Sequence, residues 1–220
     1  TTAPGAEAKA VLGGSTYTAT ANGSGVAAIS VKKAGKYTVS ATISGKTSAS
    51  VEVNVTEAGE NYTATVKIPI AAIPSQGESL TYTGQAQTPT FDDYNSAELT
   101  LGGTTSGTNA GSYNASFTPK SGYQWNDGTT TAKTVAWSIA KAAGSLSLNP
   151  TSLSLDGDTP TGAVAVTRAG DGAITATSGD PDVVSVSVSG NKVNVTALDE
   201  GNVTVTVKVA AGTNHNAPAN

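Results

Sequence analysis

The side chains best able to do acid, base or nucleophilic chemistry are few in this sequence. His215 is the only histidine, and the chain contains no cysteine. A cysteine nucleophile is therefore excluded, and a serine triad would need His215 as its base. His215 lies among Gly, Asn, Ala and Pro residues near the end of the sequence, where we expect a solvated linker. These residues predict a chain without a catalytic centre.

Closely spaced aspartates are the next candidates, because neighbouring carboxylates can supply oxygen ligands to Ca²⁺. They occur beside Gly, Pro or Asn as three pairs: Asp92 with Asp93, Asp156 with Asp158, and Asp180 with Asp182. Aspartate also favours turns, since its side chain accepts hydrogen bonds from nearby backbone N–H groups. Turn chemistry is our preferred interpretation. The alternative is a Ca²⁺ site between modules with Asp156, Asp158 and Asp182 as ligands, and we expect no other cofactor.

Two regions contain the tryptophans. Trp137 alternates with Val135 and Ile139, which predicts a strand position that faces a core. The segment from Tyr123 to Asp127 has the composition of a loop, with polar residues around Trp125. Exposed aromatic rings beside Asp and Asn commonly bind sugars, so Tyr123, Trp125 and Asp127 are candidates for glycan contact. The preferred interpretation is that Trp125 instead folds over one end of a sandwich.

A covalent cross-link is a further alternative. Some bacterial surface sandwiches join a lysine to an asparagine through an isopeptide bond, assisted by a buried acid. Residues of the required types are present, among them Glu52 and Lys67. Such a bond would require these side chains to converge inside one module.

The composition indicates many short strands joined by tight turns. The chain has 25 glycines and 9 prolines, with only 5% aromatic and 13% charged residues. Abundant β-branched residues with little charge do not fit a disordered chain. The net charge of −4 and the scattered lysines exclude the basic patch that nucleic-acid binding requires. No apolar run is long enough to span a bilayer, and no signal peptide is evident.

Alternation with a period of two residues is the dominant pattern, so we expect an all-β chain with essentially no helix. Tyr37, Val39, Ala41 and Ile43 alternate with polar residues. We expect further strands at residues 51–55 and 62–68. The pattern divides the chain into three modules at residues 1–60, 61–143 and 144–210, followed by a linker tail at 211–220. Short connectors near residues 57–60 and 140–144 predict a semi-rigid rod.

The first two modules resemble bacterial immunoglobulin-like domains. Lys33–Ala41 (KAGKYTVSA) resembles a strand of small immunoglobulin-like and carboxypeptidase-regulatory-like sandwiches. The second module is similar to the MBG/YDG-type repeats of bacterial surface and phage tail proteins. Its matching segments occur in the family's order: Leu80–Gln87, Gly107–Phe117 and Thr134–Ala140.

The third module resembles the BIG2 (intimin/invasin-type) bacterial immunoglobulin-like domain. The segments that match are Leu146–Leu155, Ser178–Val186, Gly190–Ala197 and Gly201–Val207. Gly179 replaces the serine that usually precedes the Asp-Pro pair, and the usual tryptophan is missing. The resemblances imply three tandem immunoglobulin-like β-sandwiches.

The function implied is structural. A series of such modules resembles the tail or decoration regions of phage virions and the adhesins of bacterial surfaces. We expect a non-catalytic, extracellular spacer and attachment element that contacts cell-surface glycan or protein receptors, or other virion or surface subunits. The alternatives are a carbohydrate-binding module and an accessory part of a secreted enzyme.

Overall fold

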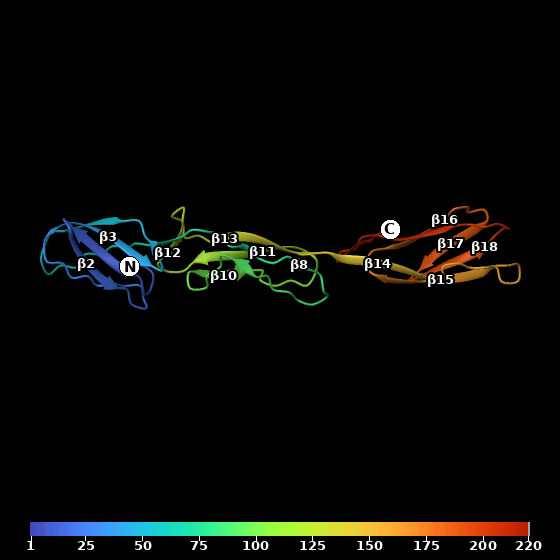
Figure 1. Ribbon diagram of the computed structural model, residues 1–220, viewed down its shortest axis with the longest axis horizontal. Helices are drawn as coiled ribbons and strands as arrows, with labels where there is room; N and C mark the ends of the chain where they lie inside the picture. The colour runs from blue at the N-terminus through green and yellow to red at the C-terminus, as the bar shows by residue number, and fades with distance from the viewer. Residues whose placement is uncertain (220) are drawn as a thin grey trace. The chain divides into compact units, whose positions relative to one another are not determined.

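The computed structural model describes residues 1–219, and within them all regular structure is β-strand. The expectation of an all-β chain without helix is therefore confirmed for this range, and no helix capable of crossing a membrane occurs in it. The chain divides into two compact units. Figure 1 shows the strands of both units as arrows, coloured by residue number. Unit 1 consists of Thr1–Glu78, Pro89–Thr105 and Asn114–Trp137, and unit 2 consists of the remaining described residues.

Unit 1 begins with an antiparallel five-stranded sheet. Its order is β2-β1-β3-β4, with β5 paired to the other part of β3. Alternate residues face inward as the pattern predicted, so that Ala8, Tyr37 and Ala41 are buried. The strands are β1 (Glu7–Leu12), β2 (Ser15–Thr20), β3 (Gly35–Ile43), β4 (Lys46–Thr47) and β5 (Val51–Val55).

The later part of unit 1 has the larger aromatic core. Phe117 and Trp137 are buried, which confirms the core-facing position expected for Trp137. The Phe91 ring packs edge-on against Phe117, with 5.0 Å between centroids. The strands are β6 (Ile68–Ile70), β7 (Ser75–Gln76), β9 (Phe91–Asp92), β10 (Leu99–Gly103), β11 (Gly111–Pro119), β12 (Tyr123–Trp125) and β13 (Lys133–Ala140), of which β11 and β13 continue into unit 2.

The strand expected at residues 62–68 was only partly correct. Regular pairing starts at Ile68, where β6 runs parallel to β12. Residues 62–66 alternate in sequence but have no long neighbouring strand to form a ladder. Their pairing is confined to Thr1, whose amino group donates to the Ala64 carbonyl and whose carbonyl accepts the Val66 N–H at 2.9 Å.

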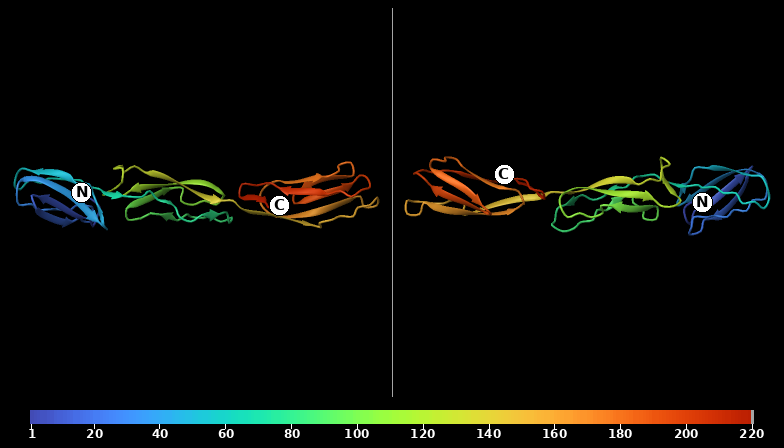
Figure 2. Two further views of the ribbon diagram at one scale, coloured as in Figure 1. Left: turned by 45° about the horizontal axis from the view of Figure 1, so that its top comes forward. Right: turned by 180° about the vertical axis from the view of Figure 1, so that it is seen from behind.

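From β14 onward, unit 2 forms two sheets that face each other (Figure 2), while its β8 pairs with β13 in a third sheet. One has the order β17-β18-β15-β14-β20, and the other pairs β16 with β19. The core is small and aliphatic, centred on Val166, Val193 and Val195. The strands are β8 (Leu80–Thr81), β14 (Ala142–Asn149), β15 (Thr161–Ala169), β16 (Ile174–Ser178), β17 (Val184–Ser189), β18 (Lys192–Ala197), β19 (Val205–Val209) and β20 (His215–Pro218).

The interpretation of residues 211–220 as a linker was wrong for the part that forms β20. This strand lies parallel to β14, with Ala142 opposite His215 and Gly144 opposite Pro218. Its sequence, His-Asn-Ala-Pro, lacks apolar alternation because an edge strand needs only backbone hydrogen bonds to one neighbour. The end of the described chain is therefore part of a sheet.

A buried ion pair joins the two parts of unit 1. The Lys46 ammonium on β4 lies 2.7 Å from both carboxylate oxygens of Glu98, in the segment that precedes β10. The Glu98 side chain is only 9% exposed and that of Lys46 is 35% exposed. Burial of the ring and the nearby charge of Glu98 raise the pKa of Tyr123. Glu98 thus depends on Lys46 for its charge compensation.

Replacing Lys46 with methionine should destabilise the chain by about 2 kcal/mol, because the Glu98 carboxylate would remain buried without its cation. Urea unfolding followed by tryptophan fluorescence measures the loss. Lys36→Met is the matched control, since Lys36 pairs with Glu52 at 2.7 Å while both side chains are more than 60% exposed. Equal effects of the two substitutions would contradict the assigned role of the buried pair.

Candidate functional site

The loop after β12 folds onto its own aromatic residue. Trp125 is 1% exposed, and its indole N–H donates to the Thr131 carbonyl at 2.8 Å. The Lys133 ammonium lies 5.2 Å from the centroid of the Trp125 ring, within the range of a cation–π contact. Asp127 accepts hydrogen bonds from Thr129 and forms a 2.7 Å ion pair with Lys133. These contacts hold the pKa of Asp127 well below its usual range, chiefly through Lys133.

Of the three residues expected to contact glycan at this loop, one is exposed. Asp127 is half exposed, whereas Tyr123 and Trp125 are both buried, with their backbones paired to β6. Stacking on a sugar requires an accessible ring face, so glycan binding here would require the loop to open. Contact by these three residues stays a prediction. Burial of Trp125 agrees with the preferred interpretation that this ring folds into the sandwich.

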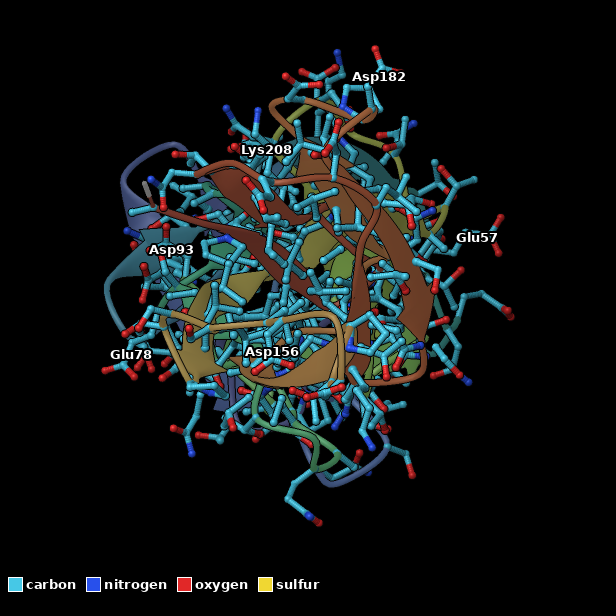
Figure 3. All side chains as sticks on the ribbon, turned by 90° about the vertical axis from the view of Figure 1, so that its right-hand side faces the viewer. Glu57, Glu78, Asp93, Asp156, Asp182 and Lys208 are labelled. Carbon is cyan, nitrogen blue, oxygen red and sulfur yellow. The ribbon has the colours of Figure 1, made fainter. Side chains whose placement is uncertain are left out.

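The aspartates proposed as Ca²⁺ ligands are engaged in turns. Asp156 Oδ1 accepts hydrogen bonds from the N–H groups of Asp158 and Thr159 at 3.1 and 2.7 Å, and from the Thr159 hydroxyl at 2.8 Å. The Thr159 contacts lower the pKa of Asp156. The Asp182 N–H donates to Asp180 at 3.1 Å. Figure 3 shows Asp156 and Asp182 apart on the surface of unit 2, and residues 1–219 contain no cluster of metal-ligating side chains.

His215 is packed instead of solvated, a feature that the sequence interpretation missed. Its side chain is 21% exposed, and its Nδ1 lies 3.3 Å from the Asp171 carboxylate. The His215 ring meets Tyr82 edge-on with 5.3 Å between centroids. The Asp171 carboxylate also accepts the N–H groups of Asn214 and His215, and the bond from Asn214 contributes most to its lowered pKa. This cluster orders the turn before β20.

The acid considered for an isopeptide bond does not lie in a core. Glu52 is 63% exposed and pairs with Lys36, so it would not provide the buried acid that such a reaction needs. The acid that is buried in unit 1 is Glu98, which holds Lys46 as an ion pair. The isopeptide alternative therefore gains no support at Glu52 and Lys67.

Each unit has a large cavity whose walls are partly polar and partly apolar. The cavity of unit 2 has a volume of about 890 Å³ and that of unit 1 about 770 Å³. Branched aliphatic side chains form much of both walls, and His215 lines neither. Representative lining residues are Leu148, Leu155, Val164, Val195 and Val207 in unit 2, and Ala10, Ile29, Tyr37, Val53 and Val66 in unit 1.

A scan against protein-family models finds no match to this chain, and a search of curated proteins also finds none. The resemblance to MBG-type and BIG2-type domains therefore rests on the order of the sequence motifs, and it stays a prediction.

Removing the Lys133 ammonium should raise the pKa of Asp127 toward its ordinary value. Because the folded pKa is depressed, the contacts of Asp127 stabilise the loop above about pH 4 and are lost as the pH falls through the folded pKa. Carboxyl chemical shifts measured against pH in Lys133→Met test this. Lys120→Met is the control, since the Lys120 ammonium binds a backbone carbonyl at 2.6 Å. An unchanged Asp127 titration in Lys133→Met would refute the assigned cause.

Adding Ca²⁺ should leave the melting temperature unchanged, because the carboxylates of Asp156 and Asp182 lie on separate loops. Calorimetric melting in excess Ca²⁺ and in excess chelator provides the comparison. A higher melting temperature in Ca²⁺ that disappears in Asp156→Asn would establish the site that the sequence suggested.

Proposed function

We propose that this chain is a non-catalytic array of immunoglobulin-like β-sandwiches on the outside of a phage particle or a bacterial cell. It acts as a spacer and as an attachment element toward surface glycans, receptor proteins or other subunits of the same assembly. The sandwiches proposed are those at residues 1–60, 61–143 and 144–210, the last extended to include β20.

The strand order of unit 2 supports the immunoglobulin-like assignment. An immunoglobulin constant-type sandwich places its first, second, fifth and fourth strands in one sheet, and its third and sixth strands in the other. Counted from β14, unit 2 has the order β14-β15-β18-β17 in one sheet and β16-β19 in the other. The seventh strand by this count is β20, and here the order departs from the constant type: β20 pairs with β14 in the first sheet, whereas the constant-type sandwich places its seventh strand beside the sixth.

The observation that carries the spacer proposal is the connection into this sandwich. Strand β13 ends at Ala140 and β14 begins at Ala142, so the connector is the single residue Lys141. Its ammonium donates to the Gly212 carbonyl at 2.6 Å, and the next N–H, of Ala142, donates to the Asn214 carbonyl at 2.9 Å. A one-residue connector that is bound to residues 212–214 hinges less than a flexible linker does. This stiffness suits a protein that keeps two bodies apart.

The outer faces of the strands suit exposure to solvent. Along β14 the exposed positions include Ser145, Ser147 and Asn149, while Leu146 and Leu148 face inward. Neutral hydroxyl and amide side chains keep a sheet surface soluble without a strong charge. The packing of His215 against Asp171 and Tyr82 supports a structural role for the one histidine.

Antibodies raised against the purified chain should label the outside of intact source bacteria or purified phage particles. Labelling before permeabilisation is the expected result, with a cytoplasmic marker as the control for leakage. The proposed location would be overturned if bacteria were labelled only after permeabilisation and purified phage particles were not labelled. Hydrolysis of a glycan or peptide substrate by the purified chain would overturn the non-catalytic assignment.

A further inference from the structure

We propose that this chain is built to carry tension along its backbone. In two places a segment entering a folded part pairs in parallel with the segment that leaves it, so that pulling on the chain loads their hydrogen bonds in shear. In a third place β8, which follows β6 and β7, pairs in parallel with the leaving strand β13. This inference deepens the proposed function, because a spacer that attaches one body to another is stretched when the two move apart.

The first of the three pairs is β14 with β20, whose register shifts between Ala142 and Gly144. The two strands enter and leave the sandwich of unit 2 and run parallel, with Ala142 opposite His215 and Gly144 opposite Pro218. Gly144 permits this contact, because a Cβ there would lie 2.2 Å from the Asn216 carbonyl oxygen. The Asp171 carboxylate holds the start of β20 through the N–H groups of Asn214 and His215.

The second pair joins β8 with the end of β13. Leu80 lies opposite Ile139 and Thr81 opposite Ala140, again in parallel, and the Tyr82 N–H donates to the Ala140 carbonyl at 2.9 Å. Ile139 is 2% exposed, so the Leu80–Ile139 end of this short pairing is the better shielded from water, whereas Thr81 and Ala140 are exposed. Shielding matters because water competes for exposed hydrogen bonds and lowers their net contribution.

The third pair is the contact of Thr1 with residues 64–66. Thr1 donates to the Ala64 carbonyl and accepts from the Val66 N–H, the pattern of a parallel bridge. The Thr1 and Thr65 hydroxyls add a bond of 3.1 Å. Thr1 enters the first sheet region and Val66 leaves it, so the relation is the one found for β14 with β20.

Parallel pairing decides how the load is distributed. In a parallel pair, tension pulls the first strand by its beginning and the last strand by its end, which are at opposite ends of the pair. The strands must then slide past each other and strain all their hydrogen bonds together. In an antiparallel pair the two pulled ends are adjacent, and the bonds break one after another. Forced unfolding depends on the rate of this step rather than on the equilibrium free energy of unfolding.

The parallel pairs also do not arise from local hairpin formation. Strands adjacent in sequence can pair in antiparallel through a tight turn, as β17 does with β18. Parallel pairs require a long crossing connection. The chain between β14 and β20 forms the rest of the unit 2 sandwich. The hydrogen bonds between these two strands therefore join the points where the backbone enters and leaves the sandwich.

Single-molecule pulling on the full chain tests the proposal. The chain has no cysteine, so a pair of introduced cysteines defines the pulling points without ambiguity. Handles at the two termini load β14 and β20 in shear, and the released chain length identifies the step of unit 2. Handles at Asp182→Cys and Leu198→Cys, which flank β17 and β18, peel an antiparallel pair of the same sandwich. We expect a higher unfolding force for the terminal handles. An equal or lower force would overturn the proposal.

Glycine substitutions provide the second arm. Gly144→Ala should displace β20 and speed the forced unfolding of unit 2 by about tenfold at fixed load, as expected for the loss of one or two backbone hydrogen bonds. Gly157→Ala is the matched control, since a Cβ at Gly157 has no heavy atom within 4 Å. Equal rates for the two variants would overturn the role of β20.

The two arms do not depend on each other. If Gly144→Ala fails to fold, the comparison of pulling directions in otherwise wild-type chain still decides the proposal. Both measurements use the purified chain, so they are also independent of the antibody labelling. External labelling with a low force from the terminal handles would reject the tension-bearing role and leave the spacer role intact.

Discussion

The burial of alternate side chains against a thin core is the constraint on which both units depend. Each long strand buries one face and gives the other to solvent, and small or branched residues such as Val193 and Ala41 supply most of the buried face. Side chains of this size close two layers only where the sheets approach closely. Cavities of about 890 and 770 Å³, with walls that are partly polar and partly apolar, lie in unit 2 and unit 1. Large rings are concentrated in unit 1, where Trp125, Trp137 and Phe117 fill the space.

Because the cores are thin, other contacts contribute a larger share of the stability. Deleting one methylene from a small aliphatic core removes a large share of its apolar burial, and no disulfide can compensate in a chain without cysteine. Unit 1 adds the buried pair of Lys46 and Glu98, which is strong only because both Glu98 oxygens are bound. Unit 2 adds backbone pairing at its edge through β20. The ion pair and the backbone pairing therefore add stability to units whose side-chain packing contributes little.

Local patterns in the sequence predicted the elements that local physics decides. Alternation located β3 and the inward position of Trp137, and the turn preference of aspartate agreed with the contacts of Asp156. Features set by distant partners were not predictable. Strand β20 pairs with residues more than 70 positions earlier, and its own sequence has no apolar period. The burial of Trp125 depends on Thr131 and Lys133 closing over the ring, which composition alone presented as an open loop.

The small core of unit 2 and its parallel pair of strands are related through the way each would resist unfolding. The resistance to forced unfolding that side-chain packing provides rises with the buried area of the core, which is small in unit 2. The resistance that a sheared strand pair provides depends on how many backbone hydrogen bonds are strained together. A sandwich with an aliphatic core can therefore hold under load if the strands that enter and leave it are neighbours. Gly144 is the residue that admits this arrangement, because its missing side chain lets the β20 backbone lie against β14. A substitution there would alter the core very little and the pairing of β14 with β20 directly.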